Sequence, residues 1–214
     1  QRAIMNMDSE TGVSIMKIVP QLDAGPVMMQ ERVKITPEMN YEDLSKKMSQ
    51  IGSKLILDSI KLIESDKANF VSQKESEATY AKKIQKNESK INWNESAKKI
   101  IAKINAFNPN PGCWFKLSGA RVKITKAIEV KNSGEVGRII DNKMTIACAK
   151  NAIQILELKK EGKKQNCTFF VVSTVANNRS NEQIVVHLKL KSKKRTRLYT
   201  SIDYTVSLLQ HDGH

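Results

Sequence analysis

The chain has 214 residues, of which 40% are hydrophobic and only 5% aromatic, so one large or two small domains with an aliphatic core are expected. Its net charge of +14 favours a polyanionic partner, with nucleic acid ahead of an anionic membrane surface. No apolar run approaches the roughly 18 residues of a membrane helix, and no secretory signal is visible. Cys113, Cys148 and Cys167 lack CxxC spacing, which favours a reduced, cytoplasmic protein over a disulfide framework.

Two predicted strands, residues 13–19 and 27–35, flank a turn at residues 21–26. The turn places the carboxylate of Asp23 at a strand end, where loops commonly present functional groups. Asp and Gly are also frequent in turns for local hydrogen-bonding reasons. The turn by itself therefore favours a structural role for Asp23.

Two helices are predicted from capping residues and apolar periodicity. The first covers residues 41–64, with Asn40 as its N-cap and one apolar face. That face consists of Leu44, Met48, Ile51 and Leu55. Gly52 inside this helix indicates either a weak point or a close approach to a neighbour. The second helix is expected after the N-cap Asn94, and Pro and Gly in residues 108–112 end it.

Between the helices, residues 66–92 are polar and lysine-rich, as expected of an extended linker between domains. Short strands separated by turns follow the second helix, which favours a small OB-like barrel, a fold that often binds nucleic acid. The predicted strands are residues 113–117, 120–130, 137–140, 144–149 and 152–158. Fold alone does not establish function.

Four blocks in register resemble the methionyl-tRNA formyltransferase family. They are residues 1–4 with 10–16 (ETGVSIM) and 22–26 (LDAGP), residues 79–84 (TYAKKI) with 91–93 (INW), residues 106–112 (AFNPNPG) with Trp114, and residues 153–158 (IQILEL) with 161–164 (EGKK). The first block is shared among folate-dependent formyltransferases, whereas the later blocks are similar to those of the tRNA-modifying member.

The resemblance implies a truncated α/β, Rossmann-like formyltransferase domain over residues 1–66, a linker over 67–92 and an OB-like tRNA-binding domain over 93–164. The chain begins with Gln1 inside an amphipathic pattern, so we expect a missing N-terminal portion. Residues 165–214 depart from the family, and a frameshift is our hypothesis for their origin. Three tail segments are nevertheless strand-like: 168–172, 183–186 and 204–207. The tail also carries a basic run of Lys189, Lys191, Lys193, Lys194, Arg195 and Arg197, to which we assign no role.

The family transfers a formyl group from 10-formyltetrahydrofolate to the amino group of methionyl-initiator tRNA, without a metal. The resemblance implies that Asp23 is the catalytic carboxylate and that Gln21, Leu22 and Gly25 form the donor-pocket loop. The family's catalytic Asn and His lie in an upstream Asn-x-His motif that this chain lacks. We therefore expect the chain alone to be inactive. We also expect it to be a monomer with no membrane partner.

Basic residues of the linker and barrel are expected to contact tRNA phosphates. They are Lys82, Lys83, Lys86, Lys90, Lys99, Lys103, Arg121, Lys123 and Lys126. Such contacts would position tRNA without reading its sequence. Trp93 and Trp114 are expected in the core rather than stacked on bases. A stand-alone RNA-binding module is the alternative; another folate-dependent formyltransferase is disfavoured by residues 80–84 and 106–112.

Overall fold

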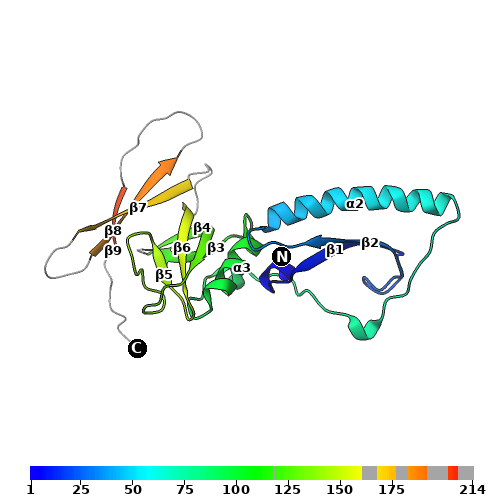
Figure 1. Cartoon of the computed structure of the whole chain (residues 1–214), viewed down its shortest axis with the longest axis horizontal. Helices are drawn as coiled ribbons and strands as arrows, with labels where there is room; N and C mark the ends of the chain where they lie inside the picture. The colour runs from blue at the N-terminus through cyan, green and yellow to red at the C-terminus, as the bar shows by residue number, and fades with distance from the viewer. Residues whose placement is uncertain (118, 161–167, 177–182, 192–201, 207–214) are drawn as a thin grey trace. The chain divides into compact units, whose positions relative to one another are not determined.

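Figure 1 shows the computed structural model, which describes residues 1–117, 119–160, 168–176, 183–191 and 202–206. The chain divides into two compact units, residues 1–84 and residues 85–214. Each unit has its own packed elements, and each is described by itself below. The domain limits predicted at residues 66, 92 and 164 stay predictions.

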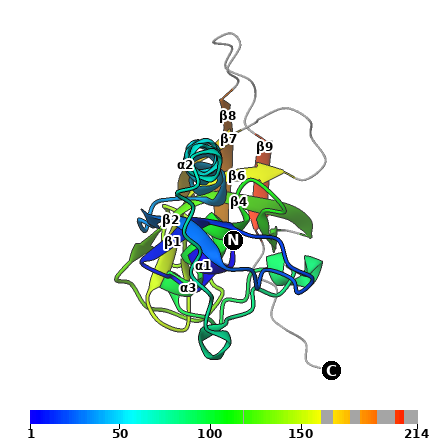
Figure 2. The same ribbon diagram turned by 90° about the vertical axis from the view of Figure 1, so that its right-hand side faces the viewer.

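The N-terminal unit is a helix laid on a β-hairpin. The short helix α1 (Arg2–Met5) leads into strand β1 (Glu10–Met16), which pairs antiparallel with β2 (Val27–Lys34). Helix α2 (Tyr41–Glu64) lies along this hairpin, and Figure 2 shows it end-on above the two strands. The first strand begins earlier than predicted and ends at Met16, because the chain leaves the ladder there to form the loop that carries Asp23.

Helix α2 begins and ends where the sequence predicts. The Asn40 side chain accepts a hydrogen bond from the backbone N–H of Asp43 (3.0 Å), which confirms the predicted cap. Leu44 and Leu55 of the predicted apolar face are buried. A Cβ placed on Gly52 would lie 3.5 Å from the side chain of Val13, so Gly52 marks a close approach of α2 to β1.

The polar stretch after α2 follows the hairpin rather than leaving it. Val71 pairs with Val27 through two backbone hydrogen bonds of 2.8 Å, one in each direction. Two single turns of 3-10 helix follow, η1 (Glu75–Glu77) and η2 (Lys86–Ser89). The chain around Val71 is thus held beside the start of β2, and the linker role of residues 67–92 stays a prediction.

The second unit, which includes η2, has one described α-helix, α3 (Ala97–Phe107), whose N-cap is Ser96 rather than the predicted Asn94. The Ser96 hydroxyl accepts from the backbone N–H of Lys99 at 3.4 Å. The prediction was wrong because the side chain of Asn92 accepts from the Asn94 N–H (3.1 Å) and holds a separate turn before the helix. The buried face of α3 includes Ile100, Ile104 and Phe107.

An antiparallel half-barrel sheet makes up the rest of the unit, with strand order β3-β4-β6-β7-β8-β9 and β5 paired to β6. The strands are β3 (Cys113–Leu117), β4 (Ala120–Val130), β5 (Thr145–Ala147), β6 (Ala152–Lys160), β7 (Thr168–Ala176), β8 (Gln183–Lys191) and β9 (Ile202–Val206). Helix α3 packs mainly against β4, so the core lies between the helix and the first strands of the sheet (Figure 1). The predicted bounds of β3 and β4 are confirmed.

One predicted strand is absent and another is shortened. Residues 137–140 make only a single bridge, Ile139 to Ile146, because Gly137 has φ +81° and the chain turns there. Met144, at φ +57°, likewise leaves only Thr145–Ala147 of the strand predicted over residues 144–149. The β-branched residues of these segments gave the strand signal, and the positive φ angles override it.

The three strand-like segments predicted in the tail are confirmed as β7, β8 and β9. Their sheet continues from β6 through the pair Leu158 and Phe169. Lys189 and Lys191 of the basic run lie in β8. The remaining members of the run, Lys193, Lys194, Arg195 and Arg197, fall outside the described residues, as does Cys167.

Candidate functional site

The loop that joins β1 to β2 carries Asp23 in a conformation that its neighbours constrain. The Lys17 N–H donates to the carbonyl oxygen of Pro26 at 3.0 Å and closes the loop. Asp23 is exposed and lies at φ +55°, a left-handed conformation that Asp tolerates better than most residues. Gly25 is buried, and a Cβ there would come within 1.7 Å of the Lys17 carbonyl oxygen. Only glycine fits at this position without moving the backbone.

Gln73, which is distant in the sequence, forms hydrogen bonds to this loop. The side-chain nitrogen of Gln73 donates to the carbonyl oxygen of Asp23 at 2.8 Å and to that of Gly25 at 2.7 Å. The same nitrogen lies 3.9 Å from the sulfur of Met16. Sequence reasoning missed Gln73, because a polar residue in a polar stretch carries no pattern that marks it as a loop anchor.

The predicted donor-loop residues share the loop with Asp23 but differ in exposure. Gln21 and Leu22 are exposed, and Leu22 retains 92% of its accessible surface. Gly25 is the buried member of the set. The N-terminal unit contains no histidine, since the chain's histidines are His187, His211 and His214. Within residues 1–84, Asp23 therefore has no imidazole partner.

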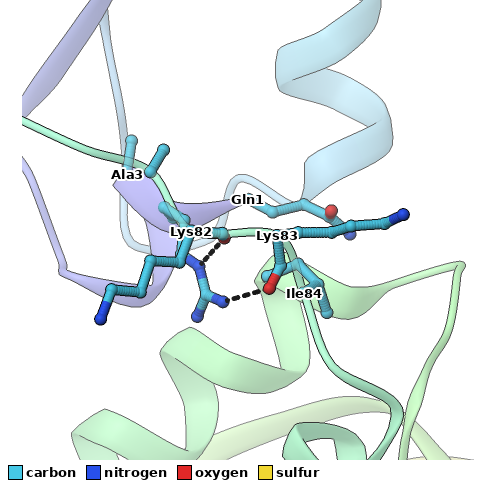
Figure 3. A pocket seen from close by; sticks show the side chains of 7 residues that line it. Gln1, Ala3, Lys82, Lys83 and Ile84 are labelled. Carbon is cyan, nitrogen blue, oxygen red and sulfur yellow. Dashed lines mark hydrogen bonds between the residues drawn. The ribbon is translucent and has the colours of Figure 1, made fainter.

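A pocket in the N-terminal unit brings α1 next to the first two predicted tRNA-contacting lysines. Its volume is about 540 Å³, and it is lined by Gln1, Arg2, Ala3, Ala81, Lys82, Lys83 and Ile84 (Figure 3). The Arg2 guanidinium donates to the carbonyl oxygens of Lys82 (2.8 Å) and Lys83 (3.2 Å). Figure 3 shows the side chains of these two lysines pointing in opposite directions. Arg2 thus holds their backbone and leaves both side chains on the surface.

In the second unit, two of the predicted phosphate contacts are engaged internally. The Lys103 ammonium lies 3.1 Å and 3.3 Å from the two carboxylate oxygens of Glu95, and its side chain is only 15% exposed. The Lys123 ammonium donates to the carbonyl oxygen of Pro111 at 2.7 Å. The other members of the predicted set in this unit have exposed side chains: Lys86, Lys90, Lys99, Arg121 and Lys126.

Trp114 contacts Arg121 and is linked through Ser89 to the backbone of Lys86. The Arg121 guanidinium carbon lies 3.8 Å from the centre of the Trp114 ring, a cation–π contact. The indole N–H donates to the Ser89 hydroxyl (3.1 Å), which itself donates to the Lys86 carbonyl oxygen (2.7 Å). The Trp114 carbonyl oxygen accepts from the Ile91 N–H (2.9 Å). Trp114 therefore fixes the segment that carries Lys86 against β3, on a half-buried ring.

The second tryptophan packs inside the same unit. Trp93 meets the Phe115 ring edge-on, with the ring centroids 5.5 Å apart. A Cβ on Gly137 would lie 3.4 Å from the Trp93 ring, so the turn at Gly137 covers the indole. Both tryptophans pack against protein groups but are only half-buried, so the prediction that they lie in the core holds only in part.

The perturbed titratable groups of the second unit are two buried cysteines and one aspartate that accepts hydrogen bonds in a turn. Burial raises the pKa of the Cys113 thiol to about 12 and that of Cys148 to about 11. Burial favours a higher pKa for Asp141 as well. Hydrogen bonds from Thr145 and Lys143 outweigh that effect and hold its pKa below the usual value.

Among the described residues, no three His, Cys, Asp or Glu side chains gather closely enough to hold a metal ion. In that part of the chain, no helix is both long and apolar enough to cross a membrane.

Comparison with known families gives matches in both units. Residues 1–60 match the family described as formyl transferase, and residues 83–168 match formyl transferase, C-terminal domain. The methionyl-tRNA formyltransferase of Pelagibacter ubique is 43% identical over 176 residues, which cover 81% of this chain and 57% of that protein. The enzyme of the same name from Bradyrhizobium diazoefficiens is 40% identical over 166 residues, which cover 76% and 53%. The chain thus spans about half the length of the curated relatives it matches.

Solved structures share the fold at lower identity. HypX from Aquifex aeolicus, solved with tetrahydrofolic acid, aligns with a TM-score of 0.60 at 19% identity, over 79% of this chain and 30% of HypX. WlaRD, a sugar 3N-formyl transferase, aligns with a TM-score of 0.58 at 22% identity, over 76% of this chain and 59% of WlaRD. At this level of identity the alignments support the fold alone.

Proposed function

Because this chain is a homologue of the methionyl-tRNA formyltransferases and matches both formyl transferase families, we propose that it takes part in formyl transfer to methionyl-initiator tRNA. The donor is 10-formyltetrahydrofolate, in keeping with the folate-dependent family. The proposal extends to the finer architecture: the N-terminal unit is part of a Rossmann-like catalytic domain, and the half-barrel belongs to an OB-like domain. The observation that carries it is the constrained loop that presents Asp23 at a strand end.

The chemistry gives the Asp23 carboxylate a task. The attacking amine must be uncharged and must lose a proton as it is acylated, and the tetrahedral oxyanion needs hydrogen-bond donors. A carboxylate favours the protonated form of a neighbouring histidine and fixes its orientation. It can also receive the amine's proton, directly or through water. The exposed position of Asp23 leaves its side chain accessible to such partners.

The histidine that the family uses has no counterpart in residues 1–84, where histidine is absent. We therefore propose that the 214-residue chain is inactive on its own. Purified chain, formyl donor and methionyl-tRNA are expected to yield no formyl-methionyl-tRNA above background. Donor-dependent turnover by the chain would refute this part of the proposal.

An active context for testing Asp23 is a chimera. The N-terminal segment of the Pelagibacter ubique relative, 43% identical over the matched region, would be joined to residues 1–164 of this chain. Turnover by the chimera, together with its loss in the Asp23→Asn variant, is the result that the proposal requires. General acid–base groups typically contribute on the order of 10²–10⁴-fold, so a loss of about that size is expected.

For tRNA, we propose that the exposed basic residues make the phosphate contacts and that the two internally bonded lysines do not. Binding should weaken steeply with salt, because each neutralised phosphate releases a counterion. Lys90→Ala and Lys126→Ala, at exposed sites, should each lower tRNA affinity and make the salt slope shallower. Lys123→Ala is the matched control, since its ammonium binds the Pro111 carbonyl. Equal losses from all three changes would contradict the assignment.

A stand-alone RNA-binding module is the second candidate, favoured by the net charge of +14 and the exposed cations of the second unit. It predicts tRNA binding without any contribution from Asp23 to chemistry. The chimera separates the two functions, because only the enzyme predicts that Asp23→Asn removes turnover while tRNA affinity is kept.

A further inference from the structure

We infer that Gln73 is a positioning residue of the formyl-transfer site: its side-chain amide holds the loop that presents Asp23. The inference rests on the proposed function for its catalytic meaning, whereas the hold itself follows from geometry. Gln73 lies in the polar stretch after α2, outside the loop and outside the four blocks of family resemblance.

The amide has one orientation that satisfies its surroundings. Both partners are backbone carbonyl oxygens, those of Asp23 at 2.8 Å and Gly25 at 2.7 Å, and only the NH₂ end of the Gln73 amide can donate to them. The two hydrogens of that group serve two acceptors on either side of Ala24. The contact therefore fixes the loop at two points, rather than touching it at one.

The held conformation is one that the loop would not keep without support. Asp23 sits at φ +55°, which is less stable than a right-handed or extended conformation for a residue with a Cβ. A carbonyl bonded to Gln73 cannot rotate with its peptide plane without losing that bond. Because the peptide planes around Asp23 set the direction of its side chain, Gln73 controls where the carboxylate points.

The segment that carries Gln73 is itself held by backbone hydrogen bonds to the hairpin. Two residues earlier, Val71 pairs with Val27 through two backbone hydrogen bonds of 2.8 Å, and Val27 is the first residue of β2 after the loop. The glutamine thus reaches the loop from a segment that is already fixed to the end of the hairpin. A pre-positioned donor loses less side-chain freedom on bonding than a free one would, so the contact is retained although Gln73 is exposed.

Hydrogen exchange of the complete 214-residue chain tests the hold directly. The reporter is the Lys17 amide, whose bond to Pro26 closes the loop. Gln73→Glu keeps the length and branching of the side chain but replaces the donor with a carboxylate that only accepts. We expect the Lys17 amide to exchange about tenfold faster in this variant, which corresponds to about 1.4 kcal/mol. The Leu55 amide in the middle of α2 should not change.

Two further variants separate a lost donor from general damage. Gln73→Lys places an ammonium with three donors near the same carbonyls and should restore most of the protection at Lys17. Gln50→Glu, on the exposed surface of α2, introduces the same charge away from the loop and should leave exchange at Lys17 unchanged. Unchanged exchange in Gln73→Glu, or equal acceleration in Gln50→Glu, overturns the hold whatever the fate of the proposed function.

The catalytic meaning is tested in the chimera of residues 1–164 with the relative's N-terminal segment. Gln73→Glu should lower kcat about tenfold with little change in KM for the formyl donor, and Gln73→Lys should recover kcat. If Asp23→Asn removes turnover but Gln73→Glu leaves kcat unchanged, the positioning role is overturned and the proposed function stands. If Asp23→Asn leaves turnover intact, the proposed function fails, and faster exchange at Lys17 in Gln73→Glu would still support a purely structural hold.

Discussion

Replacing Gly25 with alanine should disrupt the Asp23 loop more than any other single methyl group in the N-terminal unit. A Cβ at position 25 would lie 1.7 Å from the Lys17 carbonyl oxygen, whereas real Cβ contacts are essentially never below 3.0 Å. The two backbone segments must therefore separate by about 1.3 Å, the difference between these distances. Neither atom belongs to a flexible side chain, so the loop itself has to move.

The size of the effect follows from the bonds that such a movement breaks. Three hydrogen bonds end on the displaced loop. They are the bond from the Lys17 N–H to Pro26 and the two bonds from Gln73 to the carbonyl oxygens of Asp23 and Gly25. Each is worth about 1 kcal/mol net, so their combined loss gives an upper bound of about 3 kcal/mol. Urea unfolding followed by far-UV circular dichroism measures this loss, because the 24-residue helix α2 dominates the signal of its unit.

Gly52→Ala is the matched control and should act in the opposite direction. Its Cβ would meet the Val13 side chain at 3.5 Å, an ordinary van der Waals contact, within a helix. Alanine is favoured over glycine in a helix interior by about 0.8–1.0 kcal/mol, so this variant should be more stable than the wild type. If Gly25→Ala unfolds at the wild-type urea concentration and keeps the Lys17 amide protected, the constrained-loop account is refuted.

Three further predictions concern the second unit. Ser96→Ala should lower stability by about 1 kcal/mol in urea unfolding through loss of the α3 cap, and an equal loss from Asn94→Ala would contradict that capping assignment. Asp141→Asn should destabilise the unit at pH 7 by about 1 kcal/mol; because the folded pKa of Asp141 is depressed, the wild-type advantage should vanish as pH falls through that pKa, and a pH-independent difference would contradict this. The pKa of Cys113 is raised from 9.0 to about 12, so the contribution of its neutral thiol to stability is complete below pH 9 and is lost between pH 9 and 12. In site-resolved alkylation at pH 8, Cys113 should react only after the chain unfolds. Rapid labelling of Cys113 in the folded chain would contradict its burial.

Local signals in the sequence were sufficient where one physical rule acted without a competitor. The extent of helix α2 is predictable because Asn40 supplies a cap and the apolar period runs unbroken through Leu44 and Leu55. At α3 two rules competed, since Asn92 formed a turn with Asn94 and moved the cap to Ser96. The strand predicted at residues 137–140 failed for a related reason: its β-branched residues adjoin a glycine at φ +81°.

In the candidate site, too, features set by neighbouring residues were predictable and contacts between distant residues were not. The position of Asp23 at a strand end was predictable, because the turn residues around it are local. The hold by Gln73 was not, since the two residues are 50 positions apart in the sequence and no periodic pattern relates them. Composition likewise did not reveal that Glu95 binds the ammonium of Lys103, because a partner for a charge is set by the packed structure.

We propose above that Asp23 serves as the carboxylate of a formyltransferase site. The most direct measurement is the rate of formyl transfer to methionyl-tRNA by the chimera, compared between the wild-type loop and Asp23→Asn, with tRNA affinity measured in parallel. We expect Asp23→Asn to lower kcat by on the order of 10²-fold or more and to leave tRNA affinity unchanged. Turnover by Asp23→Asn at the wild-type rate would contradict it.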